Sequence, residues 1–203
     1  MTHVRSSSYF LMAVAALAVV LSACAQPSSP SRFYVLSTTE AVDGQRGAFK
    51  PARERSIGIG PVSMPTYLDK PQIVTNATRY QLDLAEFDQW AEPLGGNVTR
   101  VLVDNVSILM DSDRIHEFPA NTAVRDDYQV AVDIVRYDCQ VGGQCKLVAR
   151  WSVFDLRRNK QISAKRSEYE KTPTQFGFEG LAQAMSEALA DLSRDIAKRI
   201  QKF

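Results

Sequence analysis

The chain has 203 residues, of which 24 are basic and 23 acidic, and its formal net charge is +1 at pH 7. This balance gives no electrostatic case for nucleic-acid binding, which favours a strongly basic face. The length is suited to one domain of ordinary size.

The first predicted element is an export signal over residues 1–23. Arg5 precedes an unbroken apolar run over residues 10–21, which is shorter than the roughly 20 apolar residues of a membrane-spanning helix. The sequence Leu-Ser-Ala then leads directly to Cys24, and this order resembles the lipobox of bacterial lipoproteins. The resemblance implies that Cys24 is acylated and becomes the N-terminus of the mature chain. The alternative is an ordinary cleaved signal with a cysteine nearby.

Residues 24–32 form the next predicted element, a lipidated linker rich in proline and serine. Two or more acyl chains give stable membrane binding. Ala25 stands where aspartate retains many lipoproteins at the inner membrane, so similarity to that sorting rule implies the periplasmic face of the outer membrane. Arg5 is the one charged residue that leaves with the signal, so the mature chain carries 23 basic and 23 acidic residues.

Residues 33–203 are predicted to form a single periplasmic α/β domain of the α+β kind. After a strand at 33–36 and a polar loop at 38–55, we expect a strand at 56–62 and a strand pair at 73–75 and 80–84. Apolar spacing predicts a helix that begins near Asn97 as its N-cap, and a long helix over 178–202. Between the helices, antiparallel strands are predicted at 128–139, 145–155 and 161–170. The expected architecture is two layers, a mainly antiparallel sheet covered by two helices.

Cys139 and Cys145 flank the predicted turn between two of these strands. Cysteines that face each other across a hairpin can meet disulfide geometry, and an oxidising compartment favours the bond. A disulfide is therefore predicted. The alternative is a metal or redox pair, but the spacing is not C-x-x-C and no histidine lies nearby.

The sequence predicts no catalytic residue, no metal site and no cofactor. Gly58 and Gly60 could belong to a phosphate-binding turn, but Pro61 follows at once and no helix begins there. His116 is the sole histidine after the signal, and we interpret it as a surface or strand-end residue. Asp88 and Glu92 would be neighbours on a helical turn, as paired acid–base carboxylates could be, but a solvated acidic face is the simpler interpretation.

The segment over residues 60–94 combines four prolines with several aromatic residues. Proline fixes φ and removes a backbone donor, which favours a rigid and irregular surface. Exposed aromatic side chains on such a surface are typical of protein interfaces. Equally, these rings could cover the core.

The same segment resembles the PqiC-like family, the auxiliary lipoproteins of ABC-type and MCE-type envelope transport systems. The matching stretches are IGIGPV at 57–62, PTYLDKPQIVT at 65–75 and LAEFDQWAEPL at 84–94. Arginine is common in the family where this chain has Lys70 and Asn76.

The resemblance implies a non-enzymatic accessory or docking component of MCE-type lipid transport between membranes, with an MCE-domain periplasmic protein as its partner. It also implies self-association, for which a ring is one form. The alternative function is a structural or chaperone-like role in envelope assembly without transport. The hypothesised contact residues share the two longer stretches: Pro65, Tyr67, Leu68, Asp69, Pro71, Gln72, Glu86, Phe87, Asp88, Trp90 and Glu92.

Overall fold

The structure is a computed structural model that describes residues 30–51, 53–119, 125–140 and 142–203. The predicted signal and residues 24–29 of the linker, with Cys24, lie outside the described residues. Residues 31–203 form one compact unit.

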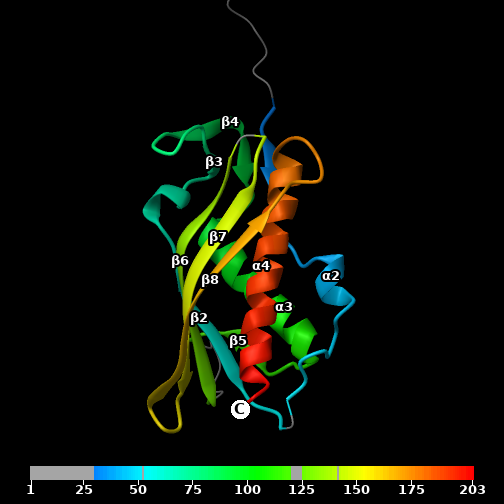
Figure 1. The fold of residues 1–203 in the computed structure, drawn as a ribbon, viewed down its shortest axis with the longest axis vertical. Helices are drawn as coiled ribbons and strands as arrows, with labels where there is room; N and C mark the ends of the chain where they lie inside the picture. The colour runs from blue at the N-terminus through cyan, green and yellow to red at the C-terminus, as the bar shows by residue number, and fades with distance from the viewer. Residues whose placement is uncertain (1–29, 52, 120–124, 141) are drawn as a thin grey trace, which may run out of the picture. The chain divides into compact units, whose positions relative to one another are not determined.

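The unit combines an eight-stranded mixed sheet with two main helices (Figure 1). The helices are α3 (Leu94–Met110) and α4 (Phe178–Ile200), and a single turn of helix, α2, covers Glu40–Asp43. The strands are β1 (Arg32–Tyr34), β2 (Ile57–Ser63), β3 (Gln72–Asn76), β4 (Leu82–Trp90), β5 (Ile115–Glu117), β6 (Tyr128–Gln140), β7 (Cys145–Asp155) and β8 (Lys160–Lys171).

The long strands β6, β7 and β8 are antiparallel neighbours, as predicted. The other edge of β6 is shared by two strands in tandem. β2 pairs in parallel with its first half, and β3 pairs in parallel with its last two residues. β4 is antiparallel to β3, and β1 is parallel to β4. The chain therefore leaves the edge of β6 after Ser63 and returns to it at Thr75.

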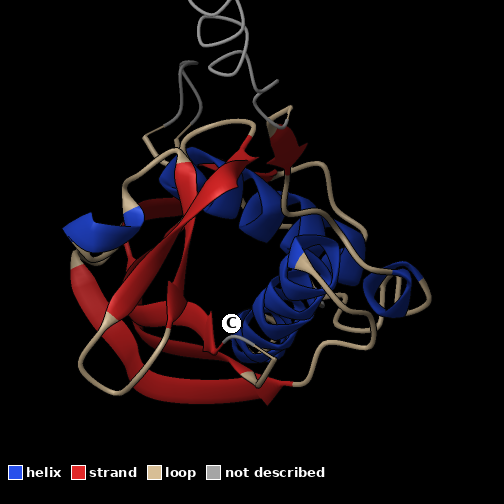
Figure 2. Ribbon diagram, turned by 90° about the horizontal axis from the view of Figure 1, so that it is seen from above, coloured by secondary structure: helices blue, strands red, loops and turns tan. Residues whose placement is uncertain are grey.

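Both helices pack on the same side of the curved sheet (Figure 2). The apolar stripe predicted for α4 is buried: its six residues are each at most 8% exposed. Because the two helices and one face of the sheet close around these side chains, the core is continuous. The predicted fold, with two helices on a mostly antiparallel sheet, is confirmed.

Three local predictions were wrong. α3 begins at Leu94, directly after Pro93, and Asn97 lies inside the helix rather than at its N-cap. Glu86 and Asp88 lie on extended strand β4, so Asp88 and Glu92 are not neighbours on a helical turn. The segment predicted as loop over 38–55 contains α2.

Two features went unpredicted, strand β5 and the parallel pairing at the edge of β6. β5 has three residues, too few for a pattern of alternation to be visible.

Candidate interaction surfaces

The structure brings the two longer motif segments together. Residues 64–71 are the excursion that the chain makes between β2 and β3, and it contains the short helix η1 (Thr66–Leu68). The Trp90 N–H donates to the Pro71 carbonyl at 2.7 Å. Next to it, Gln72 pairs with Gln89 in the sheet. The hypothesised contact residues on both segments therefore belong to one continuous region.

Not all of these residues present their side chains to solvent. Leu68, Asp88 and Trp90 are buried, at 2%, 4% and 6% exposure. Their side chains therefore act inside the domain. Exposed members are Asp69, Pro71 and Glu86, and partly exposed members are Pro65, Tyr67, Gln72, Phe87 and Glu92.

Asp88 joins β4 to β1. Its carboxylate accepts two hydrogen bonds from Arg32, at 2.8 and 2.9 Å, and one from the Tyr34 hydroxyl at 2.7 Å. Burial alone would raise the pKa of Asp88, but the hydrogen bonds from Arg32 and Tyr34 outweigh it and lower this pKa below its ordinary value. The ionised carboxylate thus holds the first strand of the domain against its neighbour.

A second buried carboxylate, Asp138 on β6, bonds the segment 64–71 between β2 and β3. It accepts hydrogen bonds from the Tyr67 hydroxyl at 3.0 Å, from Arg136 Nε at 2.8 Å, and from the Asn76 side-chain amide. Burial and the Asp138 charge raise the pKa of Tyr67 to about 12. Arg136 also forms an ion pair with Asp138, and it supplies the positive charge beside this carboxylate.

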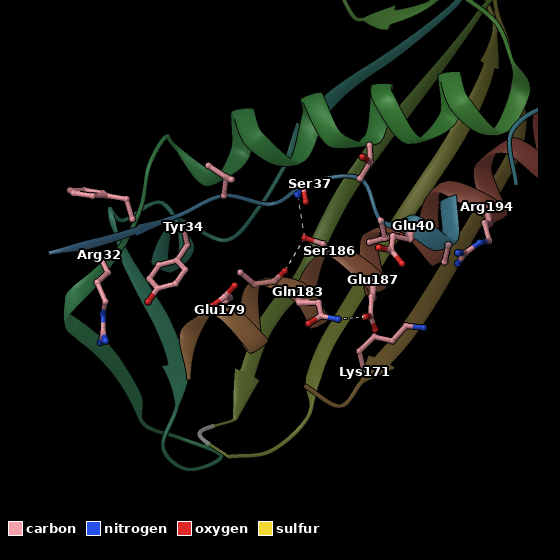
Figure 3. Close-up of a pocket in the computed structure, with 17 residues that line it drawn as sticks. Arg32, Tyr34, Ser37, Glu40, Lys171, Glu179, Gln183, Ser186, Glu187 and Arg194 are labelled. Atoms are coloured by element: carbon pink, nitrogen blue, oxygen red, sulfur yellow. Dashed lines mark hydrogen bonds between the residues drawn. The ribbon is translucent and has the colours of Figure 1, made fainter. Parts of the chain in front are cut away.

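The chain after β1 is fixed to both helices. The side-chain oxygen of buried Asn97 accepts from the Leu36 N–H at 2.6 Å, and its amide donates to the Leu36 carbonyl at 3.1 Å. One residue on, the Ser37 N–H donates to Ser186 Oγ of α4 at 3.2 Å (Figure 3). These three bonds hold an irregular segment that has no strand partner at this point.

Between this segment and α4 lies a groove with a volume of about 940 Å³. Three carboxylates face it, Glu40 from α2 and Glu179 and Glu187 from α4 (Figure 3). Within the part of the chain that the structure describes, none of the three has an ion pair. At the far end Lys171 and Arg194 both pair with Asp191. The groove offers charge and hydrogen-bonding groups, which suit a polar segment of another protein.

The described residues do not assemble into a nucleophile–base pair around the histidine. His116 lies within β5, partly buried, with Nε2 2.6 Å from Asp126 Oδ1, and Ser56 Oγ donates to the same oxygen at 3.0 Å. In a Ser-His-Asp triad the imidazole stands between the other two groups. Here the Asp126 carboxylate lies between Ser56 and His116, so the imidazole is not placed to take the serine proton.

Gly58 and Gly60 are required by close packing rather than by a phosphate-binding turn. A Cβ on Gly58 would lie 2.8 Å from the Phe118 ring, and one on Gly60 would lie 2.5 Å from the Phe118 carbonyl oxygen. Gly60 also has φ of 138°, a conformation that favours glycine. Within the described ranges, no cluster of His, Cys, Asp or Glu could hold a metal ion, and no helix there is both long and apolar enough to cross a membrane.

Cys139 and Cys145 form the predicted disulfide across the β6–β7 turn. Both cysteines are buried, at 1% exposure, and Cys145 lies against the start of α4, near the Leu181 carbonyl. The bond closes the end of the sheet where the longest strands meet the longest helix. The basic turn between β7 and β8 lies at the opposite end, where Arg157 pairs with Asp127 and Arg158 with Asp155.

Comparisons with known proteins agree with this class of fold. The sequence model of the ABC-type transport auxiliary lipoprotein component family matches residues 34–197, which is nearly the whole described domain. The chain belongs to this family. It is thus a lipid-anchored lipoprotein of the cell envelope and an auxiliary component of an ABC-type transport system. No curated protein matches the sequence.

Two solved structures share the fold. One, described as an uncharacterized protein, has a TM-score of 0.67 at 17% identity and covers 85% of this chain and 99% of its own. The second is XCC0632 from Xanthomonas campestris, of the DUF330 family, with a TM-score of 0.62 at 13% identity, covering 84% of this chain and 95% of its own. At these identities the likeness shows the fold alone.

A third solved structure is a PelC dodecamer from Paraburkholderia phytofirmans. Its TM-score is 0.44 at 11% identity, and it covers 74% of this chain and 92% of its own. A likeness this weak says nothing about the assembly of the present chain.

Proposed function

We propose that this chain is a non-enzymatic docking component of an MCE-type lipid transport system, anchored through acylated Cys24 to the periplasmic face of the outer membrane. Its partner is a periplasmic MCE-domain protein. Family membership supports the link to an ABC-type transporter. The resemblance of residues 57–94 to PqiC-like proteins supports the lipid cargo and the partner. Self-association, with a ring as one form, belongs to the same proposal.

The observation that carries the docking role is the junction of the two motif segments. The Trp90–Pro71 hydrogen bond and the Gln72–Gln89 pair hold them side by side. Their buried members fix the backbone, while Asp69 and Glu86 remain exposed. A rigid backbone that presents charged side chains loses little conformational entropy on binding. We assign the partner contact to this exposed region.

The test is affinity purification of the lipidated chain from gently solubilised envelopes, followed by identification of the proteins recovered. We expect an MCE-domain protein. In this proposal the partner presents basic groups to the two carboxylates. The double variant Asp69→Lys with Glu86→Lys should then reduce its recovery by about tenfold or more, because like charges opposed across an interface cost several kcal/mol.

The matched control is Asp104→Lys with Asp113→Lys, which reverses two exposed carboxylates on other elements. It should leave recovery unchanged. Recovery of barrel-assembly proteins without any MCE-domain protein would instead favour the chaperone-like role and contradict the proposal.

A further inference from the structure

The chain enters the domain at one end of the sheet, and three loops lie at the same end. β6 runs toward Gln140, β3 runs parallel to it, and β4 runs back. Because β1 is parallel to β4, the chain enters β1 from the end marked by Gln140. The β3–β4 turn, the β6–β7 turn and the β8–α4 connection lie at this end as well (Figure 1). We call this the tether end.

Large aromatic side chains project from the loops of the tether end. Tyr80, in the β3–β4 turn, is 91% exposed, and Phe176, in the β8–α4 connection, is fully exposed. Phe33 of β1 is 62% exposed, and Leu82 beside the β3–β4 turn is 39% exposed. Single exposed apolar residues are ordinary, and the feature that distinguishes these four is that they share one end of the sheet.

Basic groups accompany these aromatic side chains. The Arg79 guanidinium lies 5.8 Å from the centre of the Tyr80 ring. The Arg32 guanidinium donates to Asp88 along one edge, and the side chain remains 66% exposed to solvent. Aromatic rings beside arginine suit the headgroup level of a bilayer, where the ring is apolar and the cation meets phosphate.

We propose that the tether end is a membrane-contacting face, on which Tyr80 and Phe176 insert into the lipid interface and Arg79 contacts lipid phosphate. This inference rests on the proposed acylation of Cys24. The domain then lies against the bilayer with the tether end down, rather than hanging freely from its anchor.

The proposed partner of this face is a lipid surface because the linker over residues 24–32, which we call the tether, joins the domain to the acylated Cys24. Arg32 is the eighth residue after Cys24, and at ~3.5 Å per residue the chain between them reaches at most about 28 Å. The tether therefore keeps these aromatic tips at high effective concentration beside the bilayer. Two separate loop tips also fit the soft headgroup layer, whereas a protein partner needs a continuous complementary patch.

The test uses introduced cysteines, since Cys139 and Cys145 are bonded to each other and Cys24 is acylated in the proposal. The full-length lipidated protein carries a polarity-sensitive fluorophore at Ala77→Cys, in the same turn as Tyr80, or at Gln175→Cys, next to Phe176. The protein is reconstituted in vesicles of phosphatidylethanolamine and phosphatidylglycerol. Gln161→Cys, at the opposite end on β8, is the control site. Quenching by nitroxide-labelled lipid is compared with quenching by aqueous iodide.

We expect lipid quenching and protection from iodide at residues 77 and 175, and the reverse at residue 161. With Tyr80→Ser and Phe176→Ser added, the population of lipid-contacting molecules should fall by about tenfold or more, given the transfer free energy of a buried aromatic side chain.

Three other outcomes are informative. Iodide quenching at all three sites would overturn the proposal. Iodide protection without lipid quenching, growing with protein density, would overturn it in favour of a second copy on this face. Protein that does not float with the vesicles at all would show that the acylation of Cys24 is wrong, and that outcome is distinct from the other two.

Discussion

At the scale of single residues, two buried polar side chains decide how the start of the domain is held. Asn97 bonds both polar groups of the Leu36 backbone, and Asp88 binds Arg32 and Tyr34 of β1. Any pull on the lipid tether reaches the domain through β1. The two side chains therefore resist detachment of the strand that follows the tether.

Replacing Asn97 with alanine should lower the free energy of unfolding by about 2–4 kcal/mol. The reason is that a buried N–H and a buried C=O of Leu36 each lose a partner, at about 1–3 kcal/mol per group. Urea unfolding followed by circular dichroism measures the change. Asp104→Ala, at an exposed position of the same helix, is the control and should stay within about 0.5 kcal/mol. Equal effects of the two substitutions would contradict the role of Asn97.

Asp88 predicts a pH dependence of stability. Its pKa is lowered in the folded state, so its ionised form stabilises the fold above the ordinary carboxyl pKa of about 3.9, and this contribution disappears as pH falls through the lowered pKa. The stability difference between wild type and Asp88→Asn should therefore be largest near neutral pH and shrink below about pH 4. Urea unfolding at a series of pH values tests this.

A difference that stays constant with pH would show that the Asp88 charge is not involved. Asp69→Asn, on the exposed surface, should follow the wild type throughout the series.

At the scale of elements, the long and strongly patterned segments could be predicted and the short ones could not. α4 and strands β6 to β8 repeat their apolar spacing over many residues, so their type and order are visible in the sequence. The parallel strands at the edge of β6 depend on contacts between distant segments. The N-cap prediction for Asn97 was wrong because asparagine before an apolar stripe is often a helix N-cap. Here the Asn97 side chain instead bonds the backbone of Leu36, which is distant in sequence.

The candidate site was predictable only in part. The two motif stretches indicated the region, but their sequence did not show that Pro71 bonds Trp90, nor that Leu68 and Asp88 point inward. On a helical turn the side chains of residues 88 and 92 would be neighbours, whereas on a strand they are not. Pairing with β1 and β3 makes this segment a strand, and such pairing between distant segments is not visible in the local sequence. Tyr80 and Phe176 had no periodic signal, because they lie in turns.

The Cys139–Cys145 disulfide should add about 2 kcal/mol to stability, since it closes a short loop in the unfolded chain. The double variant Cys139→Ser with Cys145→Ser, compared with the wild type by urea unfolding, measures the contribution. Reducing agent should lower the stability of the wild type and leave the double variant unchanged. Equal stability of the oxidised wild type and the double variant would contradict this assignment.

For the whole molecule, we propose that an acylated Cys24 and the short linker hold the domain at the bilayer. Cys24→Ala should abolish incorporation of a labelled fatty acid and leave the export signal attached, as intact mass would show. Ala25→Asp should retain the label and move the protein to the inner-membrane fraction. Labelling of the Cys24→Ala variant would show that acylation occurs elsewhere.

The central claim is that the exposed region of the two motif segments docks an MCE-domain protein. Its most direct test is site-specific photocrosslinking in intact cells, with a photoreactive amino acid at Asp69 or at Glu86, and at Asp113 as the control position. We expect a light-dependent product with an MCE-domain protein from residues 69 and 86 and none from residue 113. Products from 69 and 86 that contain only further copies of this chain, or no MCE-domain protein at all, would contradict it.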